Sequence, residues 1–349
     1  MLSFLKKNII GVDIGSCALK IVQFKGGRGS YTLTAAVSVN ADKSAVAASE
    51  TGVTNAEVSG LIAEIIRSKN LKPRLAASAM PPHTLFIRNL YLPVMPERDM
   101  KEAVKWEIRK EISFPPSELI SDYVLAGSSA KSAENLVSII AFGSRRSDVE
   151  KISNILKTAG LELRVADAVP MAMLAVFDIN NDWEHGVNYA MLDIGQSRST
   201  LAIFKEKKLC FAREITYGGA DLTAALVDAM RKDQPEAEQY KIEHGLNAPD
   251  EEFKKAMSSS VEGLCAELQR SFDYYQAQFR EGAVSKLFLS GGTATLKGID
   301  EFISRSIGIS AFRHDPFKRV KIPKQLASPA LSESSPSLNV AAGLASRSI

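Results

Sequence analysis

A pattern near the start of the chain returns 180 residues later, and this repeat limits the folds open to the chain. Residues 9–24 read IIGVDIGSCALKIVQF, and residues 189–204 read YAMLDIGQSRSTLAIF. The offset between Asp13 and Asp193 is 180 (193 minus 13), and the glycines of the two Asp-Ile-Gly triplets keep it. Each segment predicts a strand, a tight turn and a second strand. A repeat of this size predicts two related lobes rather than a solenoid.

A third strand follows each hairpin. Residues 30–39 read SYTLTAAVSV after the first hairpin, and residues 207–219 read KKLCFAREITYGG after the second. Such runs, bounded by Gly and polar residues, are typical of an antiparallel meander. Apolar segments at 75–80 and 286–292 predict further strands, and helical periodicity at 56–70 predicts a helix. The predicted fold class is therefore α/β, with two lobes.

The block between the halves has another pattern. From residue 83 it reads as a strand (TLFIRNLYLPVM), a charged helix (ERDMKEAVKWEIRKEIS), two strands (DYVLAG and NLVSIIAFG) and a helix ending at Gly160. This order predicts a small inserted α+β unit. The apolar residues of FIRNLYLPVM are either strand interior or a partner contact, and Trp106, at helical spacing with Ile112, is expected in the core. The charges of KEAVKWEIRKE predict a solvated helix face.

The second half continues with less apolar sequence. A polar stretch runs to about residue 260, and a long helix is predicted over 261–279. Residues 318–337, rich in Lys, Pro and Ser, predict a loop, and 339–348 predict a short terminal helix.

Composition excludes several classes of protein. Of 349 residues, 45% are hydrophobic and 24% charged, which is ordinary for a globular protein. The 43 Lys and Arg against 40 Asp and Glu give a net charge of +3 without a dominant basic block, so no nucleic-acid partner is expected. Three scattered cysteines argue against a disulfide framework and favour a reducing compartment. No apolar run is long enough to cross a bilayer, so a cytoplasmic protein is expected.

The first residues, MLSFLKKN, are too short in their apolar part for a secretory signal. They are either a frayed lead into the first strand or a weak membrane or partner contact through Leu2, Phe4 and Leu5. GGRGS (26–30) is interpreted as a hairpin turn rather than a phosphate loop. The chain also has no G-x-x-x-x-G-K-[ST] segment, and no G-x-G-x-x-G follows a strand, which excludes a P-loop and disfavours a Rossmann site.

The two Asp-Ile-Gly turns are the candidate site. A tight turn points backbone N–H groups in one direction, and its glycine (Gly15 or Gly195) lets a phosphate approach closely. The Asp carboxylates repel phosphate, so Asp13 and Asp193 are predicted to hold Mg²⁺ through water. If the turns face each other, they clamp a polyphosphate between the lobes; the alternative is that each is only a hairpin turn. The predicted phosphate donors are Ser16 and Lys20 on one side and Ser197, Ser199 and Thr200 on the other.

SGGTATLKGI is a third candidate element. It places Gly291 and Gly292 between a strand and a helix. Bare backbone at such a place can pack against a flat base or a ribose, where a side chain would block it. The alternative is a plain strand-to-helix turn.

These motifs resemble those of the actin, sugar-kinase and chaperone ATPase superfamily. GVDIGSCALK resembles its first phosphate loop, MLDIGQSRSTLAIF its second, and LFLSGGTATLKGI, with Thr293, its adenosine motif. YGGADL resembles a Gly-Gly-x-Asp turn at Gly219, and AEQYKIEHGL resembles a segment of bacterial actins whose Glu and Lys face adenosine, here Glu238 and Lys241. Cys17 stands in the first phosphate loop, where a small polar residue is common. The resemblance implies an actin-like (ribonuclease H-like) fold that binds ATP with Mg²⁺.

A narrower resemblance is to the PilM family of type IV pilus assembly proteins, relatives of FtsA. It rests on MLSFLKKNIIGVDIGSCALKIV, FIRNLYLPVM, ERDMKEAVKWEIRKEISFPPSELISDYVL, LQRSFDYYQ and SGGTATLKGIDEFISRSIG, and VAAGLA (with Gly343) matches a terminal helix that docks on the first lobe. It implies an ATP-binding scaffold on the cytoplasmic face of the inner membrane that binds the cytoplasmic N-terminal tail of PilN. Motor ATPases, platform proteins and self-association are further candidate contacts.

The same resemblance implies subdomain boundaries, with a 1C-type insert. They are 1–82 (1A), 83–164 (1C), 165–187 (1A crossover), 188–228 (2A), 229–285 (2B), 286–336 (2A) and 337–349 (terminal helix returning to 1A).

One departure from the family bears on catalysis. Family members often carry Asp-Val-Glu-Pro after the insert, whereas this chain has DAVP, so Asp167 matches and Val169 replaces the Glu. Asp167 is a weak catalytic candidate, and no general base is evident, so at most slow ATP hydrolysis is expected, with ATP acting as a ligand and switch. The alternatives are an FtsA-like filament-forming actin homologue and a small-molecule kinase of the same superfamily.

Overall fold

A computed structural model of the chain describes residues 9–27, 30–40, 55–72, 74–126, 135–279 and 282–347. The N-terminal contact residues Leu2, Phe4 and Leu5, and Arg28 and Gly29 of the GGRGS segment, lie outside the described residues. Around that segment, Gly26 pairs with Tyr31 and Gly27 with Ser30, as in the hairpin predicted there.

The first lobe is built on a five-stranded mixed sheet in the order β3-β2-β1-β4-β8. Its first three strands are antiparallel, and β4 and β8 run parallel to β1. Helices α1 and α3 pack together against the sheet through a shared apolar core. The elements are β1 (Ile9–Ile14), β2 (Ala18–Gly27), β3 (Ser30–Asn40), α1 (Asn55–Ser68), β4 (Leu75–Ala79), α3 (Arg146–Thr158) and β8 (Glu162–Asp167).

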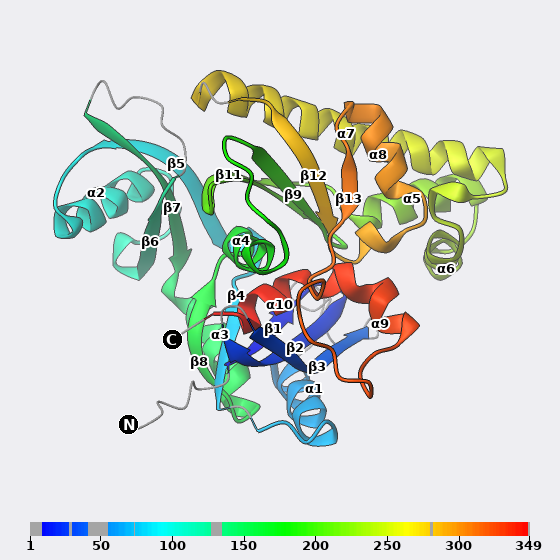
Figure 1. The fold of residues 1–349 in the computed structure, drawn as a ribbon, viewed down its shortest axis with the longest axis horizontal. Helices are drawn as coiled ribbons and strands as arrows, with labels where there is room; N and C mark the ends of the chain where they lie inside the picture. The colour runs from blue at the N-terminus through cyan, green and yellow to red at the C-terminus, as the bar shows by residue number, and fades with distance from the viewer. Residues whose placement is uncertain are drawn as a thin grey trace.

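The second lobe repeats this arrangement. Its sheet has the order β11-β10-β9-β12-β13, with three antiparallel strands followed by two parallel ones. The two-lobe prediction made from the repeat is therefore confirmed (Figure 1). The elements are β9 (Asn188–Ile194), β10 (Ser199–Lys205), β11 (Lys208–Ile215), α5 (Gly219–Met230), α6 (Gln234–His244), α7 (Glu251–Phe279), β12 (Val284–Ser290), α8 (Ile299–Ile307) and β13 (Ala311–Arg313).

The insert is a three-stranded antiparallel sheet, β5-β7-β6, with one helix on it. Helix α2 buries Met100, Val104 and Ile108, one residue every four, against this sheet. Trp106 lies off that stripe and is 61% exposed, so its predicted core position is wrong. The elements are β5 (Leu85–Pro93), α2 (Glu97–Arg109), β6 (Leu119–Leu125) and β7 (Leu136–Arg145).

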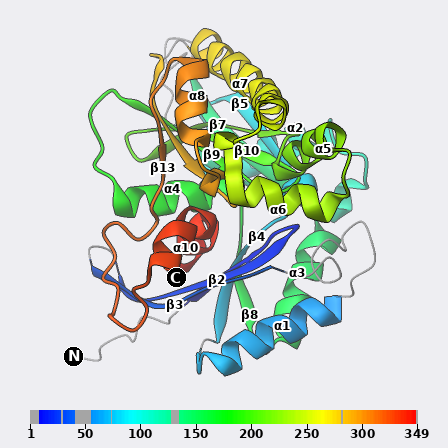
Figure 2. The ribbon, with the colours of Figure 1, turned by 90° about the vertical axis from the view of Figure 1, so that its right-hand side faces the viewer.

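Two connections join the lobes. Helix α4 (Val169–Asn180) leads from β8 to β9, and the chain returns after β13 through α9 (Pro329–Ser334) and α10 (Asn339–Ala345). Helix α10 lies against β1 and α4 in both ribbon views (Figures 1 and 2). The packing is tight, because a Cβ atom on Gly343 would lie 2.0 Å from the carbonyl oxygen of Ala172.

The structure differs from the sequence prediction in four helical segments, the first of which is α6, formed in the stretch that was predicted only to be polar. Helix α7 starts at Glu251, ten residues before the predicted start, because the polar run before 261 hides one buried residue, Met257. Helix α4 was not predicted. It is apolar on most sides because helix α10 and strands β10 and β11 pack against it, so it lacks an amphipathic period. The predicted loop holds α9, whose start is capped by Ser328 Oγ accepting from the Leu331 N–H group.

Among the described residues, none of the helices combines the length and apolar character needed to span a membrane.

Candidate functional site

The two hairpin turns are built alike and meet. In the first, the Gly15 N–H group donates to the Ala18 carbonyl at 3.1 Å, and in the second the Gly195 N–H group donates to the Arg198 carbonyl at 3.0 Å. The two donors are 180 residues apart in sequence, and so are the two acceptors. The hydroxyl of Ser197 donates to that of Ser16 at 3.3 Å, which joins the tips of the two turns across the lobes.

An acidic residue opens each turn on the side facing the other lobe. Asp13 is paired with Lys20 across the first hairpin, and Lys20 Nζ lies 3.3 Å from Asp13 Oδ2. Both side chains are nearly buried, 14% exposed for Lys20 and 15% for Asp13. Asp193 holds the same place in the second hairpin, opposite Thr200, and its Oδ1 accepts from Ser290 Oγ at 2.9 Å.

The electrostatics of Lys20 and Asp193 show that the two lobes share one charged site. Burial lowers the pKa of Lys20, but the negative charges of Asp13 and Asp193 outweigh it and leave that pKa raised. Burial also raises the pKa of Asp193, as does the charge of Asp13, while Lys20 opposes them. Two carboxylates and one ammonium group therefore lie together in a poorly solvated cleft, which favours an additional cation beside them.

The register of β10 separates the two predicted donors on it. Residues directly opposite in an antiparallel pair share a face, so Thr200 lies on the face of Asp193, and Ser199 lies on the other. Ser199 is fully buried, and its hydroxyl donates to the Tyr217 carbonyl at 2.8 Å. Ser199 therefore has a structural partner and points away from Asp193, whereas Thr200, which is also buried at 4% exposed, lies on the side of Asp193.

A second polar group lies where α5 and α6 meet. Lys241 is 3% exposed, and its Nζ donates to the Gly219 carbonyl, Thr223 Oγ1 and Glu238 Oε2 at 2.9, 2.9 and 2.8 Å. Thr223 Oγ1 also donates to Glu238 Oε2. Glu238 remains one-third exposed, so its carboxylate is the part of this group that a ligand can reach.

Gly219 connects that group to the second hairpin. A Cβ atom there would lie 2.7 Å from Thr293 Oγ1, 2.9 Å from Gln196 Oε1 and 3.2 Å from Lys241 Nζ. Thr293 Oγ1 in turn donates to the Gly195 carbonyl at 3.0 Å. The predicted residues Gly195, Gly219, Thr293 and Lys241 are therefore neighbours, and Gln196 joins them.

The two glycines after β12 differ in surroundings. Gly291 has φ +91°, and a Cβ atom there would lie 2.4 Å from the Ile194 carbonyl oxygen, so the turn itself requires glycine. A Cβ atom on Gly292 would meet nothing within 4 Å. Gly292 is the one of the pair that leaves open space for a ligand.

The predictions missed Ser290 and Glu214, two polar residues that flank Asp193 and Thr200 on adjacent strands. The pairing registers place Ser290, Asp193, Thr200 and Glu214 side by side across the second sheet. Burial raises the pKa of Glu214, and Arg198, at 3.6 Å, opposes this. Glu214 and Thr200 also lie at a closed junction with the first lobe and the insert, a slot too narrow to hold a water molecule. The only sequence signal for Glu214 is the alternation of side chains between the two faces along β11. This signal places Glu214 in the site only when the order of the strands is known.

Asp167, the weak catalytic candidate, has a partner of its own. Arg347 donates to both of its carboxylate oxygens, at 2.6 and 2.8 Å, and the side chain of Asp167 is only 8% exposed. This pair holds the end of the chain after α10 against the end of β8, which is a structural role. Val169, two residues further along the chain, lies at the same closed junction as Glu214.

The carboxylates fit a hydrated magnesium ion better than a dry, fully protein-bound metal. Among the described residues no three His, Cys, Asp or Glu side chains gather as a metal site would need. Mg²⁺ commonly takes one or two carboxylates and completes its shell with water and phosphate oxygens. Asp13 and Asp193, drawn from the two lobes, are such a pair.

Comparisons with known proteins agree with this architecture. The family model for "Type IV pilus assembly protein PilM" matches residues 11–349. The solved "PilM-PilN type IV pilus biogenesis complex" holds a chain with 25% identity and a TM-score of 0.85, and the match covers 97% of this chain and 98% of that one. The ethanolamine utilization protein EutJ from Carboxydothermus hydrogenoformans has a TM-score of 0.58 at 17% identity, over 97% of this chain and 89% of that one.

Among curated proteins, the cell division protein FtsA of Enterococcus hirae is 20% identical over 88% of this chain and 78% of its own length. EutJ of Escherichia coli is 26% identical over 44% of this chain, and the match spans about half (48%) of that protein. The fold is the actin-like ATPase fold, as predicted: mixed α/β, with two lobes of mixed sheets.

Proposed function

The chain belongs to the PilM family of type IV pilus assembly proteins, and from this premise we propose that it is an ATP-binding scaffold of the machinery that assembles type IV pili. The observation that carries the proposal is the contact between Ser16 and Ser197, which brings the two hairpins together at one cleft. In this proposal, the phosphates of ATP lie between the hairpins.

The first lobe supplies a cation and a hydroxyl to the phosphates. Lys20 is held in the cleft by Asp13, and Ser16 stands at the tip of the turn. From the second lobe, Ser197 and Thr200 face the same space. Mg²⁺, held through water by Asp13 and Asp193, would neutralise the phosphates that these carboxylates otherwise repel.

The adenosine would lie on the second lobe, over Gly292 and beside the Glu238 carboxylate. Glu238 is oriented by Lys241 and Thr223 before any ligand arrives, so its acceptor position is preorganised. Lys241 has three oxygen partners and is almost buried, and we assign it the role of holding Glu238 and Gly219 rather than of touching the base.

ATP would act as a ligand that switches the lobes to the closed state, rather than as a source of energy through hydrolysis. The phosphates contact both lobes, so they bind most tightly when the lobes are closed, and a ligand shifts an equilibrium by its differential affinity for the two states. Asp167 is taken up by Arg347 and Val169 replaces the family's Glu, so we expect hydrolysis to be slow.

The proposed partner is the cytoplasmic N-terminal tail of PilN, bound between the first lobe and the insert. The junction of these parts is apolar on the side of Met80, Leu85 and Ile87, and Thr200 lies on its other side. The junction is closed in this structure, with no room for a water molecule, so the parts would have to separate to admit the peptide. Because Thr200 also faces the phosphate cleft, closure of the lobes would reshape the peptide slot. Through PilN the protein would work on the cytoplasmic face of the inner membrane, with motor ATPases and platform proteins as further contacts.

The test is a titration of a PilN-tail peptide with and without saturating Mg²⁺–ATP. We expect the peptide Kd to change about threefold or more with nucleotide, and the ATP Kd to change by the same factor with peptide. The change should vanish in Lys20→Met and persist in Lys25→Met, which removes an exposed lysine from the same strand. An unchanged peptide Kd in wild type would contradict the proposed coupling, and a peptide that does not bind would contradict the proposed partner.

A further inference from the structure

Arg198 is a charged residue of the second hairpin that has no role in the site described so far. It follows Ser197, whose hydroxyl touches that of Ser16 at the tips of the turns, and its own carbonyl accepts from the Gly195 N–H group. The first hairpin has Ala18 at the matching place, 180 residues earlier. The second hairpin alone therefore carries a guanidinium group at this point of the turn.

In this structure the guanidinium group of Arg198 is paired with Glu214. Arg198 Nη1 lies 3.6 Å from Glu214 Oε2, which is too long for a hydrogen bond, and the Arg198 side chain is 40% exposed. An exposed ion pair of this kind contributes little to stability. A phosphate group can accept two parallel N–H bonds from a guanidinium group, and such charge-assisted contacts are stronger. Arg198 is therefore able to exchange Glu214 for a phosphate group at small cost.

Glu214 lies where the second lobe meets the insert. It belongs to β11, which packs against β5, β6 and β7 of the insert. Of the eight described residues at this closed junction, Glu214 is the only charged one, and its neighbours there include Met80, Leu85 and Ile87. Burial raises the pKa of Glu214, and the charge of Arg198 opposes this. The junction thus encloses one carboxylate that Arg198 compensates.

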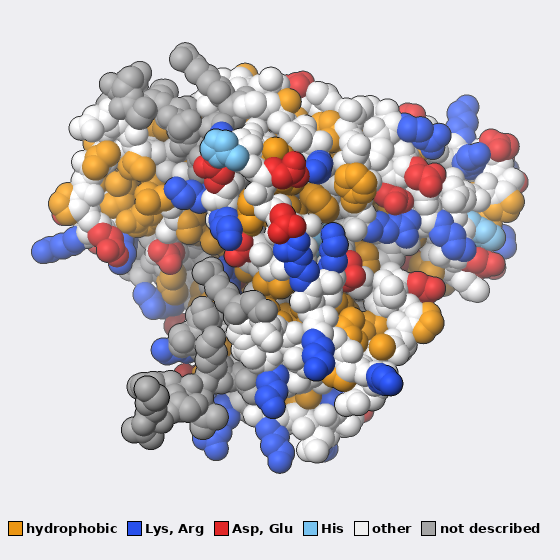
Figure 3. All heavy atoms as spheres, in the orientation of Figure 1, with side chains coloured by type: hydrophobic (Ala, Val, Ile, Leu, Met, Phe, Trp, Pro, Cys, Tyr) orange, Lys and Arg blue, Asp and Glu red, His pale blue; other side chains and the backbone are white. Residues whose placement is uncertain are grey.

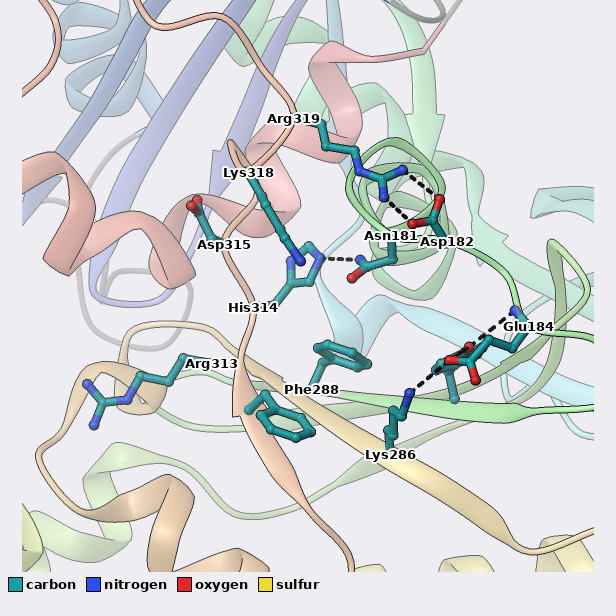
Figure 4. A pocket seen from close by; sticks show the side chains of 12 residues that line it. Asn181, Asp182, Glu184, Lys286, Phe288, Arg313, His314, Asp315, Lys318 and Arg319 are labelled. Atoms are coloured by element: carbon teal, nitrogen blue, oxygen red, sulfur yellow. Dashed lines mark hydrogen bonds and ion pairs between the residues drawn. The ribbon is translucent and has the colours of Figure 1, made fainter.

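The two connections between the lobes are a poorer route for a signal from the cleft. They are tied to each other by their own side chains: Figure 4 shows Arg319 paired with Asp182, and His314 Nε2 lies 3.0 Å from Asn181 Nδ2. Neither of these pairs includes a residue of the two hairpins. The pair of Arg198 with Glu214, in contrast, joins a hairpin directly to the strand on which the insert packs.

The insert carries most of the exposed large hydrophobic side chains. Of the seven such side chains among the described residues, four belong to the insert, namely Val94, Trp106, Ile120 and Leu125. On the face shown in Figure 3, hydrophobic side chains gather at the upper left, over the insert. Exposed apolar patches of this kind mark surfaces that meet a partner. A change in how the insert sits on β11 would therefore change what a partner meets.

We propose that Arg198 senses the γ-phosphate of ATP and that Glu214 passes this signal to the insert. Arg198 would leave Glu214 to pair with the γ-phosphate, and Glu214 would remain at the junction without a cation. An unpaired carboxylate is costly in a closed apolar junction, so the insert would loosen from β11 and let water reach Glu214. ADP has no γ-phosphate and would leave the pair intact. This role rests on the proposed place of the phosphates between the hairpins, and it adds the residues that distinguish ATP from ADP.

Calorimetric titration of Mg²⁺–ATP and Mg²⁺–ADP tests the sensor. In Arg198→Met we expect the ratio of the ADP Kd to the ATP Kd to fall about tenfold while the ADP Kd changes less than about twofold, because a contact to the γ-phosphate is lost. In Glu214→Gln we expect the same ratio to rise about threefold, because no carboxylate competes for Arg198. The matched control Arg270→Met removes an exposed arginine that pairs with Glu267 on α7 and should leave the ratio unchanged.

Thiol labelling of Ile87→Cys at pH 8 tests the link to the insert. Residue 87 is half-buried at the junction, and its labelling is read from the mass of the peptide that contains it. We expect Mg²⁺–ATP to raise the labelling rate about fivefold over that with Mg²⁺–ADP, because the junction opens. Adding Arg198→Met should raise the rate without nucleotide, and adding Glu214→Gln should make it the same with both nucleotides. The control Trp106→Cys, 61% exposed on α2, should label at one rate throughout.

Melting curves establish that each variant is folded, and the opposite changes expected for Arg198→Met and Glu214→Gln cannot both come from a general loss of stability. The proposal is overturned if Arg198→Met keeps the wild-type ratio, if Glu214→Gln lowers it, or if Ile87→Cys labels alike with ATP and ADP. In these cases the phosphate site still stands, provided that Asp13→Asn loses the Mg²⁺ dependence of ATP binding. Wild type that binds neither nucleotide would overturn the phosphate site and the sensor together.

Discussion

Ser16 and Ser197 are 181 residues apart in sequence, and their hydroxyl oxygens are 3.3 Å apart. The two hairpins differ in the residue that lies opposite the aspartate. Lys20 is opposite Asp13 in the first hairpin, and Thr200 is opposite Asp193 in the second. The repeat has therefore diverged at one cross-strand position, which gives the cleft one ammonium group between two carboxylates. This asymmetry is the basis of the phosphate clamp proposed above.

Lys241→Met should lower the free energy of unfolding by about 2–3 kcal/mol, because it leaves the Gly219 carbonyl, Thr223 and Glu238 without their charged donor. Urea denaturation measures this. The control Lys232→Met removes an exposed lysine that pairs with Glu236 at 3.4 Å and should cost less than about 0.5 kcal/mol. Equal costs for the two variants would refute the structural role given to Lys241.

Gly343→Ala should destabilise the protein by about 3 kcal/mol or more. A Cβ atom there would lie 2.0 Å from the Ala172 carbonyl oxygen, so α10 would have to move off α4. The matched control is Gly60→Ala in α1, where a Cβ atom would meet nothing within 4 Å. That substitution should stabilise by about 0.5–1 kcal/mol, since alanine is the better helix former. Thermal melting compares the two; a Gly343→Ala protein as stable as wild type would show that α10 is not packed as described.

Arg347→Met should cost about 2 kcal/mol, because it leaves the buried Asp167 carboxylate unpaired. Arg347 is itself 25% exposed, so the cost is set below that of a fully buried pair. Arg270→Met, which breaks an exposed pair with Glu267, serves as the control and should change stability by less than about 0.5 kcal/mol. A double-mutant cycle with Asp167→Asn should give a coupling energy above 1 kcal/mol. A coupling energy near zero would show that Arg347 does not hold Asp167, and Asp167 would again be a candidate for catalysis.

His314 should make stability depend on pH. Burial lowers its pKa to about 4 from the ordinary 6.5, although the bond to Asn339 and the charge of Asp315 oppose this, and Lys318 adds to the lowering. The unfolded chain therefore binds a proton that the folded protein refuses, so this contribution to stability is full above pH 6.5 and is lost as pH falls toward 4. Relative to His314→Gln, wild type should lose about 3 kcal/mol between pH 7 and pH 4. Equal pH profiles for the two proteins would contradict a neutral, buried His314.

Local patterns predicted the elements that depend on neighbouring residues. The hairpins follow from Asp-Ile-Gly between two apolar runs, and the helix before Gly160 ends there with φ +83°. Ser199 could not be placed the same way, because the side of the sheet that it faces depends on the register of β10. The pair Asp167–Arg347 joins residues 180 apart, and no local signal links them.

The candidate site was predicted in its parts and not in its connections. The repeat pointed to Asp13 and Asp193, and the resemblance to actin-like ATPases pointed to Glu238 and Lys241. Ser290, Gln196 and Glu214 were missed, because only the assembled sheet brings them to the same face or turn.

The central claim is that the two hairpins hold the phosphates of ATP through a magnesium ion, and calorimetric titration of ATP tests it most directly. The titration compares wild type with Asp13→Asn, each with Mg²⁺ and with the metal chelated. We predict that Mg²⁺ tightens binding to wild type by about tenfold or more, and that Asp13→Asn loses most of this gain while its metal-free affinity does not fall, because a negative charge beside the phosphates is gone. The same Mg²⁺ dependence in both proteins would contradict the account.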